Sequence, residues 1–216
     1  TTLFRSQRYL QALGTNPQAA ERVAQGLERI TLHANHASEV IKRLRAFLRK
    51  GQRRMQALDV AEVAREAVRM CAWEASNCQV TIEEQLPDNL PPVYADRVLL
   101  EQVLLNLLRN AIDANRESHR GQPSMIVLAA DLASDGRVEI SVHDQGPGVS
   151  EAELEKIFTP FYTSKVDGLG LGLSMSRSII EGFGGELQAR RVSVGLLMRC
   201  YLPLVGPLKI ISGVNE

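Results

Sequence analysis

Four polar side chains recur along one face of a predicted helix at residues 101–115. Gln102, Asn106, Asn110 and Asp113 follow one another at intervals of four, four and three residues, so an α-helix brings them to the same face. Asn is unfavourable inside a helix, because its side chain competes for backbone hydrogen bonds. Two explanations are open: nearby loops satisfy this face, or its oxygens face a metal-bound polyphosphate, since Mg²⁺ prefers oxygen ligands.

A carboxylate followed by two glycines comes directly after the alternating segment Val138–His143, which predicts a strand. In Asp144-Gln-Gly-Pro-Gly148, the two glycines let the backbone approach a flat ligand closely. The carboxylate of Asp144 can accept a hydrogen bond from an exocyclic amine. By itself this motif is weak evidence, because Asp-x-Gly-x-Gly also occurs by chance in turns.

A glycine-rich segment, Gly168-Leu-Gly-Leu-Gly-Leu173, opens directly into a helix predicted at residues 174–182. At a helix N-terminus the free backbone N–H groups and the helix dipole both favour an anion. The segment is therefore typical of a phosphate-binding loop. Together and in this order, the three motifs predict a nucleotide site.

Four segments together resemble the ATP-binding domain of sensor histidine kinases, over residues 59–203. They are similar, in chain order, to the N, G1, F and G2 boxes of that family: Asn106–Ala114, Asp144–Gly148, Ile157–Phe161 and Gly168–Leu173. The resemblance implies the Bergerat (GHKL) fold, an α/β sandwich of the α+β class in which helices cover one face of a mixed sheet. It also implies ATP and Mg²⁺ as cofactors.

The resemblance assigns roles to individual residues. Asp144 would bind the adenine amine, Asn110 would be the metal ligand, and Asn106 would line the phosphate side. Lys165 would reach the γ-phosphate, although a solvated loop lysine would look the same in sequence, and Arg109 is equally open. Asn106, Asn110 and Lys165 are thus the expected catalytic residues. The full set expected at the nucleotide is Asn106, Asn110, Asp113, Asp144, Gly146, Gly148, Phe158, Phe161, Lys165, Gly168, Gly170, Leu171, Gly172 and Leu173. Of these, the two phenylalanines would anchor a lid, but core aromatics would show the same pattern.

The residue type at position 106 separates two reactions. Related ATPases of this fold carry a Glu there, and a carboxylate can polarise a water molecule for attack. The amide of Asn106 cannot act as that base, which favours a kinase over an ATPase. The resemblance implies that the γ-phosphoryl group goes to a protein histidine and then to a response-regulator aspartate. Two alternatives stay open: a serine kinase of the same fold, and a non-catalytic nucleotide-binding dimerisation module.

The N-terminal part predicts a helical hairpin at residues 1–51. A helix-compatible segment at 3–13 ends at the turn 14–17, and a long helix follows. Its apolar residues step by three and four, which predicts an antiparallel hairpin that dimerises as a four-helix bundle. The heptad positions are Val23, Leu27, Ile30, Ala34, Ala37, Ile41, Leu44 and Leu48.

In the resembling family the first helix of this hairpin carries the phosphorylated histidine. Residues 3–13 contain no His, and His33 and His36 lack the acidic neighbour that the family motif requires. We therefore expect the phosphoacceptor upstream of Thr1, in a chain that does not begin with Met and reads as a fragment.

The remaining elements complete the predicted domain plan. A linker at 52–58 leads to the ATP-binding catalytic domain at 59–205, and a tail follows at 206–216. The expected helices begin at the caps Asp59, Asp96 and Ser150 and after the glycine loop. The expected strands are residues 79–86, 93–94, 125–132, 138–143, 186–192 and 196–202.

Composition narrows the kinds of partner that the chain is expected to bind. The 216 residues carry 25 Lys and Arg against 25 Asp and Glu, a balance that argues against nucleic acid as a partner. No segment is long and apolar enough to span a membrane, and three cysteines without metal-like spacing favour a reducing compartment. The expected location is cytoplasmic, free or as part of a membrane-bound sensor. The expected partners are ATP, a second copy of the chain through the hairpin, and a response-regulator receiver domain.

Overall fold

The computed structural model describes residues 54–165 and 168–205, together with Gly26, Leu27 and Ile30. The chain divides into two units, residues 1–52 and 53–216, and the second holds every strand described below. Apart from Gly26, Leu27 and Ile30, which are helical, the predicted hairpin with His33 and His36 lies outside the described residues, as does the predicted tail at 206–216. Within the described part of the chain, none of the helices combines the length and apolar composition needed to cross a membrane.

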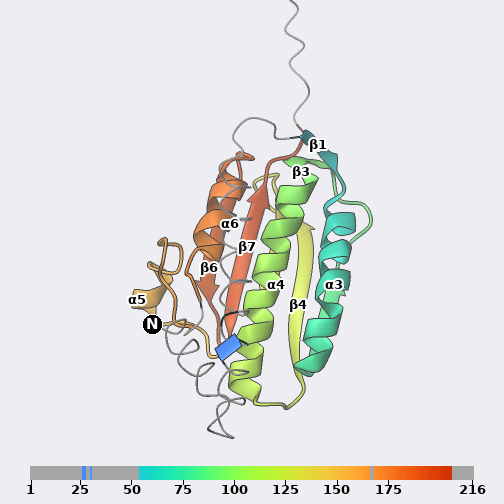
Figure 1. Cartoon of the computed structure of the whole chain (residues 1–216). Helices are drawn as coiled ribbons and strands as arrows, with labels where there is room; N and C mark the ends of the chain where they lie inside the picture. Colours follow the sequence, from blue (N-terminus) through green and yellow to red (C-terminus); the bar gives the residue numbers. More distant parts are fainter. Residues whose placement is uncertain (1–25, 28–29, 31–53, 166–167, 206–216) are drawn as a thin grey trace, which may run out of the picture. The chain divides into compact units, whose positions relative to one another are not determined.

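A five-stranded mixed sheet forms the centre of the second unit (Figure 1). Its first two strands are parallel and every other neighbouring pair is antiparallel. Across the sheet the order is β2 (Val80–Gln85), β4 (Ser124–Leu132), β5 (Val138–His143), β7 (Leu196–Leu202) and β6 (Glu186–Arg191). In β4 and β5 buried and half-buried residues alternate, as a strand with one covered face requires. The mixed sheet predicted from the motifs is confirmed.

Three helices cover one face of the sheet (Figure 1): α3 (Val60–Asn77), α4 (Arg97–His119) and α6 (Gly172–Glu181). The caps predicted for α3 and α4 are present. Asp59 accepts a hydrogen bond from the backbone of Ala61 at 2.8 Å, and Asp96 accepts one from Val98 at 3.0 Å. A short helix, α5 (Glu151–Leu154), begins at the predicted capping box of Ser150 and Glu153.

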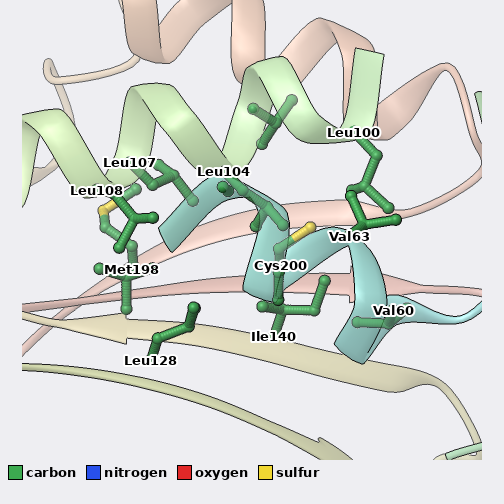
Figure 2. Packing of buried hydrophobic residues seen from close by; sticks show 14 of the residues in the cluster. Val60, Val63, Leu100, Leu104, Leu107, Leu108, Leu128, Ile140, Met198 and Cys200 are labelled. Atoms are coloured by element: carbon green, nitrogen blue, oxygen red, sulfur yellow. The ribbon is translucent and has the colours of Figure 1, made fainter. Parts of the chain in front are cut away.

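The core lies between the helices and the sheet (Figure 2). Leucines of α4 point toward the sheet and meet the inward side chains of its strands. The fully buried residues at this contact include Leu100, Leu104, Leu108, Leu128, Ile140 and Cys200. Burial of this stripe sets the rotation of α4 about its own axis, and thereby the direction of its polar face.

A second, two-stranded sheet pairs β1 (Met55–Leu58) with β3 (Val93–Asp96) in antiparallel register. The sequence did not predict β1, which lies within the stretch expected to be a linker. Four residues carry too little periodicity to show a strand, and the partner strand is far away in sequence. Asp96 strengthens the junction, because its Oδ2 atom accepts a hydrogen bond from the backbone of Arg54 at 2.8 Å.

We predict that Leu104→Ala lowers the free energy of unfolding by about 2–5 kcal/mol, because Leu104 is 0% exposed and the substitution leaves a cavity under α4. Urea denaturation measures this change. Val98→Ala on the same helix is the control, since Val98 is 72% exposed and its truncation should change stability by no more than about 0.5 kcal/mol. Equal effects of the two substitutions would contradict this view of the core.

Candidate functional site

Asn106 lies half-buried between α4 and the start of α6. Its Nδ2 atom donates a hydrogen bond to Oγ of Ser176 at 3.0 Å. Its Oδ1 atom lies so close to Gly172 that a Cβ atom at that position would be 2.5 Å away. The structure thus places Asn106 beside the N-terminus of α6, and only glycine leaves room for its side chain there.

Asn110 and Asp113 meet a lysine from the loop before α6. The Nζ atom of Lys165 donates to Oδ2 of Asp113 at 2.6 Å and to Oδ1 of Asn110 at 3.4 Å. Arg116 also pairs with Asp113, at 3.0 Å. These groups are partly exposed, so the ion pairs contribute at most about 1 kcal/mol each. The structure therefore brings the expected metal ligand and the expected phosphate-binding lysine together, and it shows that a cation can sit beside the Asn110 oxygen.

Asp144 is a buried carboxylate, only 5% exposed, at the end of β5. Its Oδ1 atom accepts hydrogen bonds from the backbone of Gly146 at 2.8 Å and of Leu196 at 3.1 Å. Burial raises the pKa of the Asp144 carboxyl, while these two N–H groups and the nearby His143 act in the opposite direction. Oδ2 has no hydrogen-bond partner among residues 54–165 and 168–205, so it is available to a ligand.

The two glycines after Asp144 permit close packing, Gly146 against α4 and Gly148 against the backbone of Gly195. A Cβ atom on Gly146 would lie 2.5 Å from the Cβ atom of Ala114, and Gly148 has a φ of 69°. A third glycine at this site, Gly195 in the turn between β6 and β7, was not predicted. A Cβ atom there would overlap the backbone oxygen of Asp144. No sequence signal linked Gly195 to this site, because it lies 51 residues further along the chain.

The second glycine segment closes against the loop that precedes it. Gly170 has a φ of 66°, and a Cβ atom there would collide with the backbone of Phe161 and Tyr162. The backbone of Phe161 donates to the Gly170 oxygen at 2.9 Å. Helix α6 begins at Gly172 without a side-chain cap, so its first N–H groups are available to an anion. The segment thus has the geometry of the predicted phosphate-binding loop, and phosphate binding itself stays a prediction.

The two phenylalanines of this loop have different surroundings. Phe158 packs partly against the core, and the guanidinium carbon of Arg177 lies 4.2 Å from its ring centroid. Phe161 is 73% exposed, so it is not a core aromatic. Leu173 packs against the core and Leu171 is half-buried, whereas a Cβ atom on Gly168 would collide with Oγ1 of Thr163. Contact of these residues with a nucleotide stays a prediction.

Arg109 contacts a different part of the domain. Its Nε atom pairs with Glu74 of α3 at 3.3 Å. The structure therefore gives Arg109 a partner on the neighbouring helix and does not bring it to the contacts of Asn106 and Asn110.

A buried amide network beside Asp144 was not predicted. Asn115 is 0% exposed, and its Nδ2 atom donates to Oγ of Ser124 at 3.1 Å and to the backbone oxygen of Met125 at 3.0 Å. Its Oδ1 atom accepts from the backbone of Gln145 at 2.7 Å, and the Gln145 side chain accepts from the backbone of Met125 at 2.8 Å. We name these four residues the Asn115 network. One sequence signal could have indicated Asn115: it is a polar residue on the apolar stripe of α4, four positions after Ala111.

A helix-covered mixed sheet, a buried carboxylate beside one glycine turn and an uncapped helix at a second glycine loop define a nucleotide-binding domain of the α/β-sandwich type. The chain belongs to the family of histidine kinase-, DNA gyrase B- and HSP90-like ATPases, whose model matches residues 95–206. This membership implies that the domain uses a nucleotide.

The relatives are sensor histidine kinases, as the motifs predicted. The chain is 36% identical over 181 residues to the C4-dicarboxylate transport sensor protein DctS of Rhodobacter capsulatus, a match that covers 83% of the chain but only 27% of DctS. The nucleotide-free catalytic domain of histidine kinase ThkA is 32% identical, with a TM-score of 0.61 over 69% of this chain and 95% of that domain. ThkA in complex with response regulator protein TrrA shares the fold, with a TM-score of 0.68 at 23% identity over 94% of this chain and 58% of that one.

We predict that Gly170→Ala weakens ATP binding by on the order of tenfold, or ~1.4 kcal/mol, because the new methyl group displaces the loop at Phe161 and Tyr162. Isothermal titration calorimetry measures the change. Gly136→Ala is the matched control: Gly136 has a similar φ of 82°, but nothing lies within 4 Å of the point that its Cβ atom would occupy. Both substitutions carry a backbone strain of about 1–2 kcal/mol. An equal loss of ATP affinity in both would contradict a local role for Gly170.

Proposed function

We propose that this chain is the catalytic part of a two-component sensor histidine kinase. It binds Mg²⁺ and ATP and transfers the γ-phosphoryl group to a histidine, from which the group passes to an aspartate of a response regulator. The observation that carries the proposal is the buried Asp144 carboxylate, which leaves one oxygen free beside a glycine turn. Such a group is an acceptor without a donor, and the exocyclic amine of adenine supplies one.

The other end of the nucleotide is assigned to the glycine loop. The first N–H groups of α6 receive the phosphates, and the helix dipole favours their charge. Lys165 lies beside Asn110 and Asp113, from where its flexible side chain can turn to the γ-phosphate as a point charge. Asn106 holds the start of α6 against α4 through Ser176. Phosphoryl transfer depends chiefly on such positioning and on charge neutralisation.

Asn110 is the residue that would hold Mg²⁺. Its amide oxygen is a hard ligand, and the Lys165 ammonium beside it supports a position that accepts positive charge. The metal would neutralise charge on the phosphates. One protein ligand suffices for this role, because Mg²⁺ in phosphate-transfer sites takes most of its ligands from phosphate and water.

The amide at position 106 supports a kinase over an ATPase. Asn106 has no carboxylate with which to deprotonate water, and its Nδ2 atom is already engaged with Ser176. Water attack on the γ-phosphate should therefore be slow, and the phosphoryl group is kept for a protein nucleophile.

Family membership supports the proposed acceptor and partners. We assign the accepting histidine to a helix before Thr1 and the dimer contact to the hairpin at 1–51, with the linker at 52–58, the catalytic domain at 59–205 and the tail at 206–216 as the domain plan. A receiver domain is the proposed onward partner, as ThkA was crystallised with the response regulator TrrA. We place the domain in the cytoplasm, where ATP is available.

The proposal is tested by incubating γ-labelled ATP and Mg²⁺ with this chain and with a version extended upstream through the proposed acceptor helix. We expect acid-labile, base-stable label on the extended version alone, and its transfer to a receiver domain. Asn110→Ala should abolish most of the label while binding of metal-free nucleotide persists. Acid-stable label would instead indicate a serine kinase, and no label despite tight ATP binding would indicate a non-catalytic module.

We further predict that ATP affinity falls with decreasing pH as Asp144 becomes protonated. Because burial raises its pKa, this loss begins above the ordinary range of an Asp carboxyl. Stability moves in the opposite direction: a carboxyl with a raised pKa in the folded state stabilises the fold as pH falls through that pKa. Titration of ATP affinity against pH, with Asp144→Asn as the control, measures the effect.

Asp144→Asn should bind ATP about 1–3 kcal/mol more weakly and lose this part of the pH dependence, because its amide presents a donor to the adenine amine. Its free energy of unfolding should change little, since the substitution removes a buried charge and keeps an oxygen for the two backbone donors. A wild-type pH profile in Asp144→Asn would contradict the adenine assignment.

A further inference from the structure

The Asn115 network lies immediately beside the proposed adenine-binding carboxylate. Asn115 belongs to α4, Ser124 and Met125 begin β4, and Gln145 follows Asp144 at the end of β5. Both N–H bonds and one lone pair of the Asn115 amide are used, so its orientation is fully determined. One buried side chain therefore connects three segments that are separate in sequence.

The network fixes the peptide bond that follows Asp144. The N–H group of this peptide belongs to Gln145 and donates to Oδ1 of Asn115 at 2.7 Å. Its carbonyl oxygen, on Asp144, faces Gly195 so closely that no Cβ atom fits between them. The peptide bond before Asp144 is also held, because the N–H of Asp144 donates to the Leu196 oxygen at 3.1 Å. With both flanking peptides fixed, the backbone of Asp144 has one orientation and its carboxylate one direction.

We propose that Asn115 is a positioning residue for base recognition, acting through the Gln145 peptide to hold Asp144 toward the exocyclic amine of the base. This inference rests on the proposed function, in which Asp144 binds adenine. Asn115 is fully buried, so its effect on a ligand must pass through the residues that it contacts. An apolar residue at this position would continue the stripe of α4 and would supply no acceptor for the loop.

The test compares ATP with inosine triphosphate, which carries a carbonyl oxygen in place of the adenine amine. The ratio of the two affinities reports the contact to Asp144, whereas a loss of general stability or of phosphate binding affects both nucleotides alike. Wild-type chain should prefer ATP, and Asp144→Asn should remove the preference. We expect Asn115→Ala to reduce the ATP preference about tenfold, which corresponds to the loss of one well-formed hydrogen bond.

Ser124→Ala is the matched control. It removes one hydrogen bond of Asn115 on the β4 side and leaves the bond to the Gln145 peptide in place. It should lower stability in urea denaturation but keep the wild-type ATP preference. An unchanged preference in folded Asn115→Ala, or an equal loss in Ser124→Ala, would overturn the inference.

Asn115→Leu decides the question if Asn115→Ala does not fold. Leu keeps the branched shape of Asn and continues the apolar stripe of α4, but it supplies no acceptor for the N–H group of Gln145, so the ATP preference should fall in the same direction. An unchanged preference in this variant would overturn the positioning role. Failure of the proposed function looks different, because wild-type chain would then show no preference for ATP over inosine triphosphate.

Discussion

Packing of α4 onto the sheet is the constraint on which the rest of the domain depends. The helix must bury its leucine stripe against β4, β5 and β7, and this burial leaves one rotation about the helix axis (Figure 2). Asn106, Asn110 and Asp113 then have to point toward the glycine loop and α6. One face of α4 therefore contributes to the apolar core, and another face of the same helix contributes to the polar site.

Asp144 shows how the fold tolerates a buried charge near this helix. Removing a carboxylate from water is unfavourable, and the raised pKa of Asp144 reports that cost. Backbone donors from Gly146 and Leu196 offset part of it at one oxygen only. The fold thus keeps a strong acceptor in a shielded place, where a hydrogen bond to a ligand is worth more than in water.

Local signals predicted most of the elements. Alternation indicated β5, the caps of α3 and α4 lie where Asp59 and Asp96 placed them, and the motifs indicated the glycine loop. What the sequence could not show depends on contacts between distant segments. Strand β1 forms only by pairing with β3. Gly195 contributes because its backbone packs against the backbone oxygen of Asp144. Asn115 contributes through its hydrogen bond with Gln145, 30 positions away. None of these contacts leaves a periodic pattern in one stretch of chain.

Asp96 gives the domain a mechanical property. One of its oxygens caps α4 and the other accepts a hydrogen bond from the backbone of Arg54, the first residue that the structure describes in the second unit. Displacement of the Arg54 backbone would therefore act directly on the N-terminal end of α4, the helix that carries Asn106 and Asn110. The β1–β3 pairing adds four residue pairs to this attachment, so the segment is held along a β-ladder and not at a single point. The chain segment that enters the domain is therefore attached directly to the start of α4.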